Sequence, residues 1–185
     1  MVQIKGSAIQ ETIKQVLRRA GEDALNKILA MLDEEARTVF KAKIFASTWY
    51  PLDVFTRFLE LEIKILAAGD ENMVTRGSEA VIERQLRGIY KVFVKLGSPE
   101  FVIKQIAAVH ATYFEGVPIE VDLPAPRSAN VRYRGFEKQH RIIGFAIIGF
   151  YRKALEISGA KDVTIHFTVP IEEGKEFAEL SITWI

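Results

Sequence analysis

Histidines are the side chains of this sequence with the broadest chemistry, and the chain has three, at positions 110, 140 and 166. An imidazole ligates metals or haem iron, moves protons, or bonds a neighbouring carbonyl in a protein interior. Glu137 and His140 stand three residues apart, a spacing that places two ligands on one helix face. A stable site needs three or four ligands, so we favour a surface polar pair here and predict no metal site.

His110 has a more apolar setting than the other two histidines. It lies late in a predicted helix, one or two turns from Ile103, Ile106 and Phe114. On such a face it could be a metal or haem ligand, a ring bonded to a backbone carbonyl, or a partly exposed edge residue. Its position alone favours the two structural interpretations over a ligand.

The common catalytic and nucleotide-binding motifs are absent. The sequence has no GxxxxGK[ST], GxGxxG, HExxH or GxSxG pattern and no EF-hand loop. Glu79 and Glu83, four residues apart, are expected on a solvated helix face. Because no nucleophile–base pair can be assembled from neighbouring positions, we predict that the chain is not an enzyme. Catalytic residues that converge from distant segments would escape such a search.

The stretch from position 127 to position 141 is locally basic. Set against the single carboxylate of Glu137, its cationic or ionisable side chains are Arg127, Arg132, Arg134, Lys138, His140 and Arg141. Such a patch could hold a phosphate, a carboxylate ligand or the acidic face of a partner. The alternative, which we favour, is a solvent-facing strand edge, where charges discourage pairing with another strand.

Composition excludes several classes of protein. The 185 residues are 49% apolar and 26% charged, which excludes a disordered chain. The net charge is +1, whereas dedicated nucleic-acid binders carry a basic excess, so we predict no nucleic-acid partner. Cysteine is absent, which removes disulfides and thiolate ligands and is compatible with a cytoplasmic location. The longest apolar run, Ile142–Tyr151, is shorter than the roughly 20 residues of a membrane span.

The first two thirds of the chain have the period of α-helices, with apolar residues three or four positions apart. The predicted helices cover residues 7–20, 24–32, a short stretch from 33, 54–68, 72–96 and 99–114. The segment 49–53 is typical of a turn, because Pro51 keeps Tyr50 out of helical geometry. The helix over 72–96 is expected to bend near Gly77.

The last third alternates apolar and polar residues instead, which is typical of strands. Strands are predicted over 117–123, 130–136, 163–169 and 178–184, with a helix over 138–158 between the second and third. The predicted fold class is α+β: an N-terminal helical layer, then a β-β-α-β-β unit with a four-stranded antiparallel sheet. We predict one domain over 1–185, made of a helical subdomain (1–116) and an α+β subdomain (117–185).

The order of these elements resembles the haem nitric oxide/oxygen-binding (H-NOX) family and its haem-free relatives. Those relatives are the vinyl-reductase-like ligand-binding domains and a paralogous family of uncharacterised myxobacterial proteins. The likeness covers nearly the whole chain and is strongest at Arg76-Gly77, Ser98–Phe101, Ala107–His110, Val131–Tyr133 and Leu180–Trp184. The resemblance implies the H-NOX-like fold and a bacterial sensor of a small ligand.

The resemblance also gives two residues a place in the family's haem site. His110 falls where the histidine that ligates haem iron would lie, and Tyr133 falls at the start of the family's Tyr-x-Ser-x-Arg motif, which binds the haem propionates. Here Gly135 replaces the serine and Glu137 replaces the arginine. A carboxylate would repel propionates that an arginine clamps. The aspartate that usually precedes the histidine in the family is also missing. The terminal Trp184 resembles the myxobacterial group more than the haem-binding members.

Our preferred hypothesis is a haem-free sensory module for signal transduction. It would bind a small apolar molecule between the helices and the sheet and pass a change of shape to a signalling protein partner. Candidate residues of the pocket, chosen by predicted face and by resemblance, are Phe93, Ile106, His110, Phe114, Tyr133 and Phe145.

Two alternatives remain at this stage. The first is a haem-based gas sensor for NO or O2, in which His110 is the axial ligand and Tyr133 contacts the cofactor. The second is an interaction scaffold with a filled core, which would act as a homodimer through its helices or sheet edge. Neither alternative predicts a membrane span.

Overall fold

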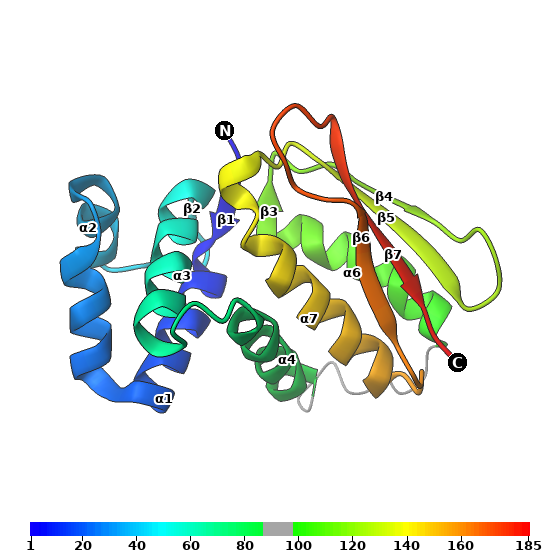
Figure 1. Ribbon diagram of the computed structural model, residues 1–185, viewed down its shortest axis with the longest axis horizontal. Coiled ribbons are helices and arrows are strands. Elements are labelled where there is room, and N and C mark those ends of the chain that lie inside the picture. Colours follow the sequence, from blue (N-terminus) through cyan, green and yellow to red (C-terminus); the bar gives the residue numbers. More distant parts are fainter. Residues whose placement is uncertain (87–97) are drawn as a thin grey trace.

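The structure is a computed structural model that describes residues 1–86 and 98–185. Three helices, α1 (Gly6–Met31), α2 (Glu34–Lys41) and α3 (Leu52–Leu66), form one side of the molecule. A four-stranded sheet forms the other side, and two further helices, α4 and α7, lie between them (Figure 1). The predicted combination of a helical layer with an antiparallel sheet is confirmed.

Helix α1 consists of two helices joined at a kink. Gly21 has φ 79° and ψ −177°, which no residue adopts within a helix and which glycine adopts at no steric cost. The sequence predicts this break at the same glycine. Helix α2 then begins at the predicted site, where the side chain of Asp33 accepts a hydrogen bond from the amide of Ala36, 2.9 Å away.

Two central helices approach each other closely. They are α4 (Asn72–Leu86) and α7 (Ile143–Ile157). A Cβ at Gly149 of α7 would lie 2.3 Å from the carbonyl oxygen of Thr75, so only glycine fits this contact. The hydroxyl of Thr75 donates to the carbonyl of Phe145, 3.1 Å away, and joins the two helices further. The part of the predicted helix 72–96 beyond Leu86 lies outside the described residues.

A small sheet, which the sequence analysis did not predict, ties three distant segments together. Its order is β2-β1-β3, from β1 (Gln3–Lys5), β2 (Trp49–Pro51) and β3 (Phe114–Glu115). The predicted turn over 49–53 is therefore wrong, because Tyr50 pairs with Ile4 in a strand. Strands of two or three residues are too short to produce a period in the sequence.

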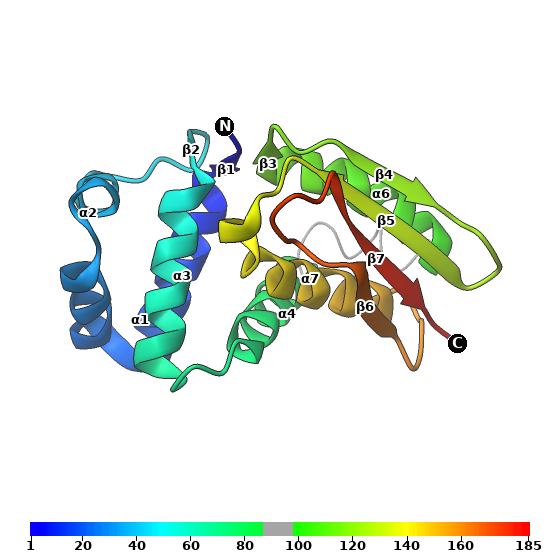
Figure 2. The ribbon, with the colours of Figure 1, turned by 45° about the horizontal axis from the view of Figure 1, so that its top comes forward.

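Helix α6 (Pro99–Tyr113) begins as predicted, with the side chain of Ser98 accepting from the amide of Phe101 at 3.3 Å. It leads directly into β3 and lies beside α7 and the first strand of the large sheet (Figure 2). The small sheet and α6 thus bring the start of the chain, its middle and the large sheet to one place.

The large sheet has the predicted β-β-α-β-β order along the chain. Its strands lie in the order β4-β5-β7-β6, all antiparallel: β4 (Ile119–Asp122), β5 (Ser128–Arg134), β6 (Thr164–Val169) and β7 (Phe177–Thr183). Between β5 and β6 the chain forms a 3-10 turn, η1 (Lys138–His140), and then α7. The helix predicted from 138 therefore starts later, at Ile143.

Among the described residues, no helix is both long and apolar enough to cross a membrane.

Candidate functional site

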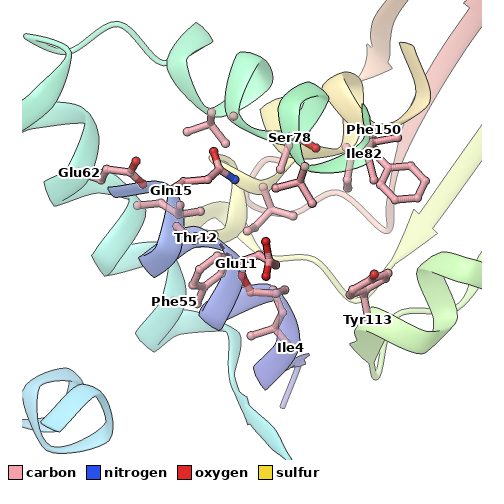
Figure 3. Close-up of a pocket in the computed structure, with 18 of the residues that line it drawn as sticks. Ile4, Glu11, Thr12, Gln15, Phe55, Glu62, Ser78, Ile82, Tyr113 and Phe150 are labelled. Carbon is pink, nitrogen blue, oxygen red and sulfur yellow. Dashed lines mark hydrogen bonds between the residues drawn. The ribbon is translucent and has the colours of Figure 1, made fainter. Parts of the chain in front are cut away.

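A cavity of about 140 Å³ lies where α1, α3, α4, α6 and α7 meet (Figure 3). Its walls are largely apolar and come from both the first and the last third of the chain, with Ile4, Phe55, Leu59, Met73, Ile82 and Ile147 among them. His110 and Phe150 stand at one end. A different set of side chains, which is polar, stands at the other end.

At the first end, His110 belongs to a chain of three buried polar side chains. Its Nδ1 lies 3.0 Å from Oη of Tyr133, and Tyr133 donates its own proton to Oη of Tyr151, also at 3.0 Å. The oxygen of Tyr133 therefore accepts from Nδ1–H of His110, which leaves the lone pair of the imidazole on Nε2. Phe150 packs edge-on against the imidazole, with ring centroids 4.5 Å apart.

All three members of this chain are electrically neutral. Burial lowers the pKa of His110 to about 3 and raises the pKa values of Tyr133 and Tyr151 above their ordinary range. The phenol–phenol bond adds to the rise for Tyr133 and opposes it for Tyr151. Because none of the three groups titrates near pH 7, the chain of hydrogen bonds has no member poised for acid–base chemistry.

At the other end, α1 and α3 place two polar side chains in an apolar surrounding. Gln15 is 8% exposed and Glu62 is 4% exposed, and both line the cavity (Figure 3). Within residues 1–86 and 98–185 neither side chain has a hydrogen-bond partner, and their polar atoms keep surface that is open to the cavity. Burial raises the pKa of Glu62 to about 7, and the charge of Arg19 opposes this rise.

These two residues were not predicted from the sequence, although it carries a signal for them. Glu62 interrupts a helix that is otherwise apolar almost all round, between Leu61 and Ile63. Gln15 stands next to Val16 on the buried stripe of α1. A polar residue inside such a stripe is either paired in the interior or part of a site.

The six residues predicted for the pocket have different positions in the structure. His110 and Phe114 line the cavity, and Tyr133 lies behind His110, with no exposed surface. Phe145 is on α7, where the Arg141 guanidinium lies 5.8 Å from its ring centroid, and it is not part of the cavity wall. Ile106 is on α6, with a side chain outside the described set, and position 93 also lies outside the described residues. The role of these six residues in binding stays a prediction.

The prediction that Glu137 and His140 form a surface pair is wrong for His140. His140 is 2% exposed, so it is an interior residue. Its Nδ1 accepts from the amide of Glu137 at 2.9 Å, and its Nε2–H donates to Oδ1 of Asp53 at 2.8 Å, which ties η1 to the start of α3. The ring is therefore satisfied by the protein itself. No cluster of three potential metal ligands exists among the residues that the structure describes.

Most cationic side chains of the basic stretch have acidic partners. Its strand, β5, lies between β4 and β7, so the interpretation as a sheet edge is wrong. Four of its cations form ion pairs across the sheet and the surface: Arg132 with Glu179, Arg134 with Glu120 and Glu176, Lys138 with Glu173, and Arg141 with Glu71. Glu79, predicted on a solvated face, pairs with Arg152 of α7 at 3.0 Å.

Several features of this site argue against haem, the cofactor that the H-NOX resemblance implies. The cavity of about 140 Å³ is smaller than the roughly 300 Å³ at which pockets for larger ligands begin. The phenol of Tyr133 is fully buried and bonded inside the core, so it cannot contact a propionate. Arg134 is paired with two carboxylates, and Glu137, where the resemblance would place an arginine, accepts a hydrogen bond from Gln139.

Comparison with known proteins identifies the fold. No family model matches the chain, and no curated protein sequence matches it. A mutant H-NOX protein from K. algicida in the unliganded Fe(II) state matches with TM-score 0.73 and 14% identity over 98% of this chain and 97% of its own.

The H-NOX protein from S. oneidensis in the Fe(II)NO state matches with TM-score 0.72 and 14% identity, over 98% and 99% of the two chains. The H-NOX protein from Shewanella woodyi in its IWP-051-bound Fe(II)CO form matches with TM-score 0.67 and 12% identity, over 96% and 93%. The predicted resemblance is therefore confirmed as a shared fold over nearly the whole chain.

Proposed function

We propose that this chain is a non-enzymatic, haem-free sensory module with the H-NOX fold, which binds a small apolar molecule in the cavity between its helices. The cavity itself carries the proposal. It is apolar over most of its surface, and its volume of about 140 Å³ is close to that of an engineered apolar cavity of about 150 Å³ that binds benzene. The ligand is accordingly a molecule of about the size of a single ring.

The position of the cavity supports a sensory role. Helices α1 and α3 contribute one wall and α6 and α7 contribute another, so a ligand contacts elements from both halves of the chain. A ligand that binds one arrangement of these helices more tightly shifts the population toward it. Because α7 also contacts β6 of the large sheet, such a shift reaches the surface that a signalling partner would contact.

Thermal unfolding with a panel of small apolar ligands tests the proposal. A ligand that binds only the folded state raises Tm in proportion to ligand concentration over Kd. Ala146 lines the cavity, so Ala146→Leu should fill it and abolish the shift. Ala108→Leu, on the exposed face of α6, is the matched control and should keep the shift. The proposal is wrong if no ligand raises Tm of the unmodified protein.

One observation supports a haem-based sensor as a second candidate. His110 lines the cavity, and its Nε2 keeps a lone pair when Nδ1 donates to Tyr133. In that case the protein, after incubation with haemin, should show a Soret band that disappears in His110→Ala. A protein that stays colourless rejects this candidate.

A further inference from the structure

We propose that the ligand is a neutral molecule with one hydroxyl group on an apolar body, and that Glu62 and Gln15 bind this hydroxyl at the polar end of the cavity. The inference rests on the proposed function, because it names the chemistry of the ligand for the same cavity. It adds a direction: the apolar body points toward Phe150 and His110, and the hydroxyl points toward α1 and α3.

The first step is that both side chains lack a partner although both are buried. About 90% of buried polar groups in proteins have a hydrogen-bond partner, because an unpaired group loses its water without compensation. Within the described residues, Glu62 and Gln15 have none, and both face the same end of one cavity (Figure 3). The imidazole at the opposite end, by contrast, is already bonded to Tyr133. Among the described residues there, only the Nε2 lone pair of that imidazole is without a partner, so most of the unmet demand for hydrogen bonds lies with Glu62 and Gln15.

The second step is the balance of donors and acceptors at this end. The hydroxyl of Thr12 donates to the carbonyl of Ala8 at 3.2 Å, so it offers only its lone pairs to the cavity. The Glu62 carboxylate offers acceptors alone, and the amide of Gln15 offers both donors and an acceptor. Arg19 also lines the cavity and offers donors alone. The Glu62 carboxylate and the Thr12 oxygen still lack a donor among the described residues, so a ligand that carries one fits beside them.

The charges around the polar end favour a neutral ligand. A ligand anion would lie next to Glu62 and Glu11 in an apolar surrounding. A ligand cation would lie near the guanidinium of Arg19, which lines the cavity. Both signs of charge therefore meet a like charge as well as the loss of hydration. A neutral group meets neither obstacle.

The two protonation states of Glu62 favour a hydroxyl over other neutral groups. With a pKa of about 7, Glu62 is present both as carboxylate and as carboxylic acid near neutral pH. A hydroxyl donates to the carboxylate and accepts from the acid, whereas a carbonyl pairs only with the acid. Gln15 can accept from or donate to the same oxygen. One hydroxyl group thus satisfies both side chains in either state.

Gly77 keeps the amide of Gln15 at this end. A Cβ at position 77 would lie 3.0 Å from Oε1 of Gln15, so a larger residue on α4 would displace the amide. Gly77→Ala is therefore a variant that moves the polar end without removing either polar group.

Toluene and benzyl alcohol form a matched pair of ligands, because they differ only in the hydroxyl. We expect benzyl alcohol to bind the unmodified protein about tenfold more tightly than toluene, as measured by calorimetry. The ratio of the two dissociation constants should fall by about tenfold in Glu62→Leu and in Gln15→Leu, and should fall in Gly77→Ala. Glu60→Gln, an exposed carboxylate change on the same helix, should leave the ratio unchanged. Circular dichroism confirms that each variant is folded.

The outcomes distinguish this inference from the function on which it rests. If both ligands bind and the ratio is the same in all variants, the hydroxyl assignment is overturned while the apolar cavity still binds ligands. If benzylamine or benzoate binds most tightly, the neutral assignment is overturned. If neither toluene nor benzyl alcohol binds the unmodified protein, the proposed function fails and takes this inference with it.

Discussion

Replacement of Glu62 by glutamine should stabilise the protein, and the stabilisation should grow with pH. Glu62 is 4% exposed and has no hydrogen-bond partner among the described residues, so its ionised form is destabilised in the folded state. Glutamine has nearly the same shape and does not ionise. The difference in unfolding free energy between the variant and the unmodified protein therefore isolates the cost of this one charge.

The size of the effect follows from the pKa. Burial raises the pKa of Glu62 from 4.5 to about 7, and the charge of Arg19 offsets part of this rise. The folded protein thus holds a proton that the unfolded chain releases, and its stability falls as pH rises through this window. Each pH unit in the window removes about 1.4 kcal/mol, so the full cost above pH 7 is about 3 kcal/mol. Below pH 4.5 the cost is absent.

The buried imidazole of His110 has the opposite effect on the pH dependence of stability. Burial lowers the pKa of His110 from 6.5 to about 3, so the folded protein excludes a proton that the unfolded chain binds. Its contribution to stability is complete above pH 6.5 and is lost as pH falls toward 3. The two residues therefore oppose each other at mildly acidic pH, and the curve of the unmodified protein alone shows neither effect clearly.

Urea unfolding at several pH values between about 5 and 8 gives the required differences. We expect the stabilisation by Glu62→Gln to increase by about 2 to 3 kcal/mol from the lowest to the highest pH. Glu60→Gln, exposed on the same helix, should give a difference that does not change with pH. A constant difference for Glu62→Gln across this range would refute the argument that the cost of burying this carboxylate exceeds the stabilisation by the charge of Arg19.

Three further changes test the packing around the cavity. Tyr133→Phe should lower the unfolding free energy by about 1 to 3 kcal/mol in urea titrations, because it leaves the Nδ1–H of His110 buried without an acceptor. His110→Gln should remove part of the acid sensitivity, so its stability relative to the unmodified protein should rise as pH falls from 6.5 toward 3. Gly149→Ala should lower Tm and weaken ligand binding in calorimetry, since a Cβ 2.3 Å from the carbonyl of Thr75 forces α4 and α7 apart.

The architecture was predictable because its long elements have clear periods. The break in α1 at Gly21 and the β-β-α-β-β order follow from glycine chemistry and from the change of period along the chain. The small sheet was not predictable, because strands as short as Phe114–Glu115 leave no pattern and depend on partners far along the chain. The division into two subdomains stays a prediction.

The site was less predictable than the fold, for a physical reason. His140 shows the difficulty: its burial depends on Asp53, a residue 87 positions away that accepts its Nε2–H. Spacing along the chain reveals which residues share a face, but not whether a distant group satisfies them. For the same reason the role of Glu62 and Gln15 could not be recognised from the sequence, because that role depends on the absence of a hydrogen-bond partner among the described residues of the folded chain.

The two ends of the cavity differ in what they leave unsatisfied, and this difference argues for the direction in which a ligand lies. The imidazole of His110 is bonded to Tyr133, which is bonded to Tyr151, so this end offers a ligand apolar contact and one acceptor, the Nε2 lone pair. Glu62 and Gln15 have no such partners. A bound hydroxyl therefore relieves a cost that the empty protein carries, and the same cost explains why removing the carboxylate should stabilise the fold while weakening recognition of the alcohol.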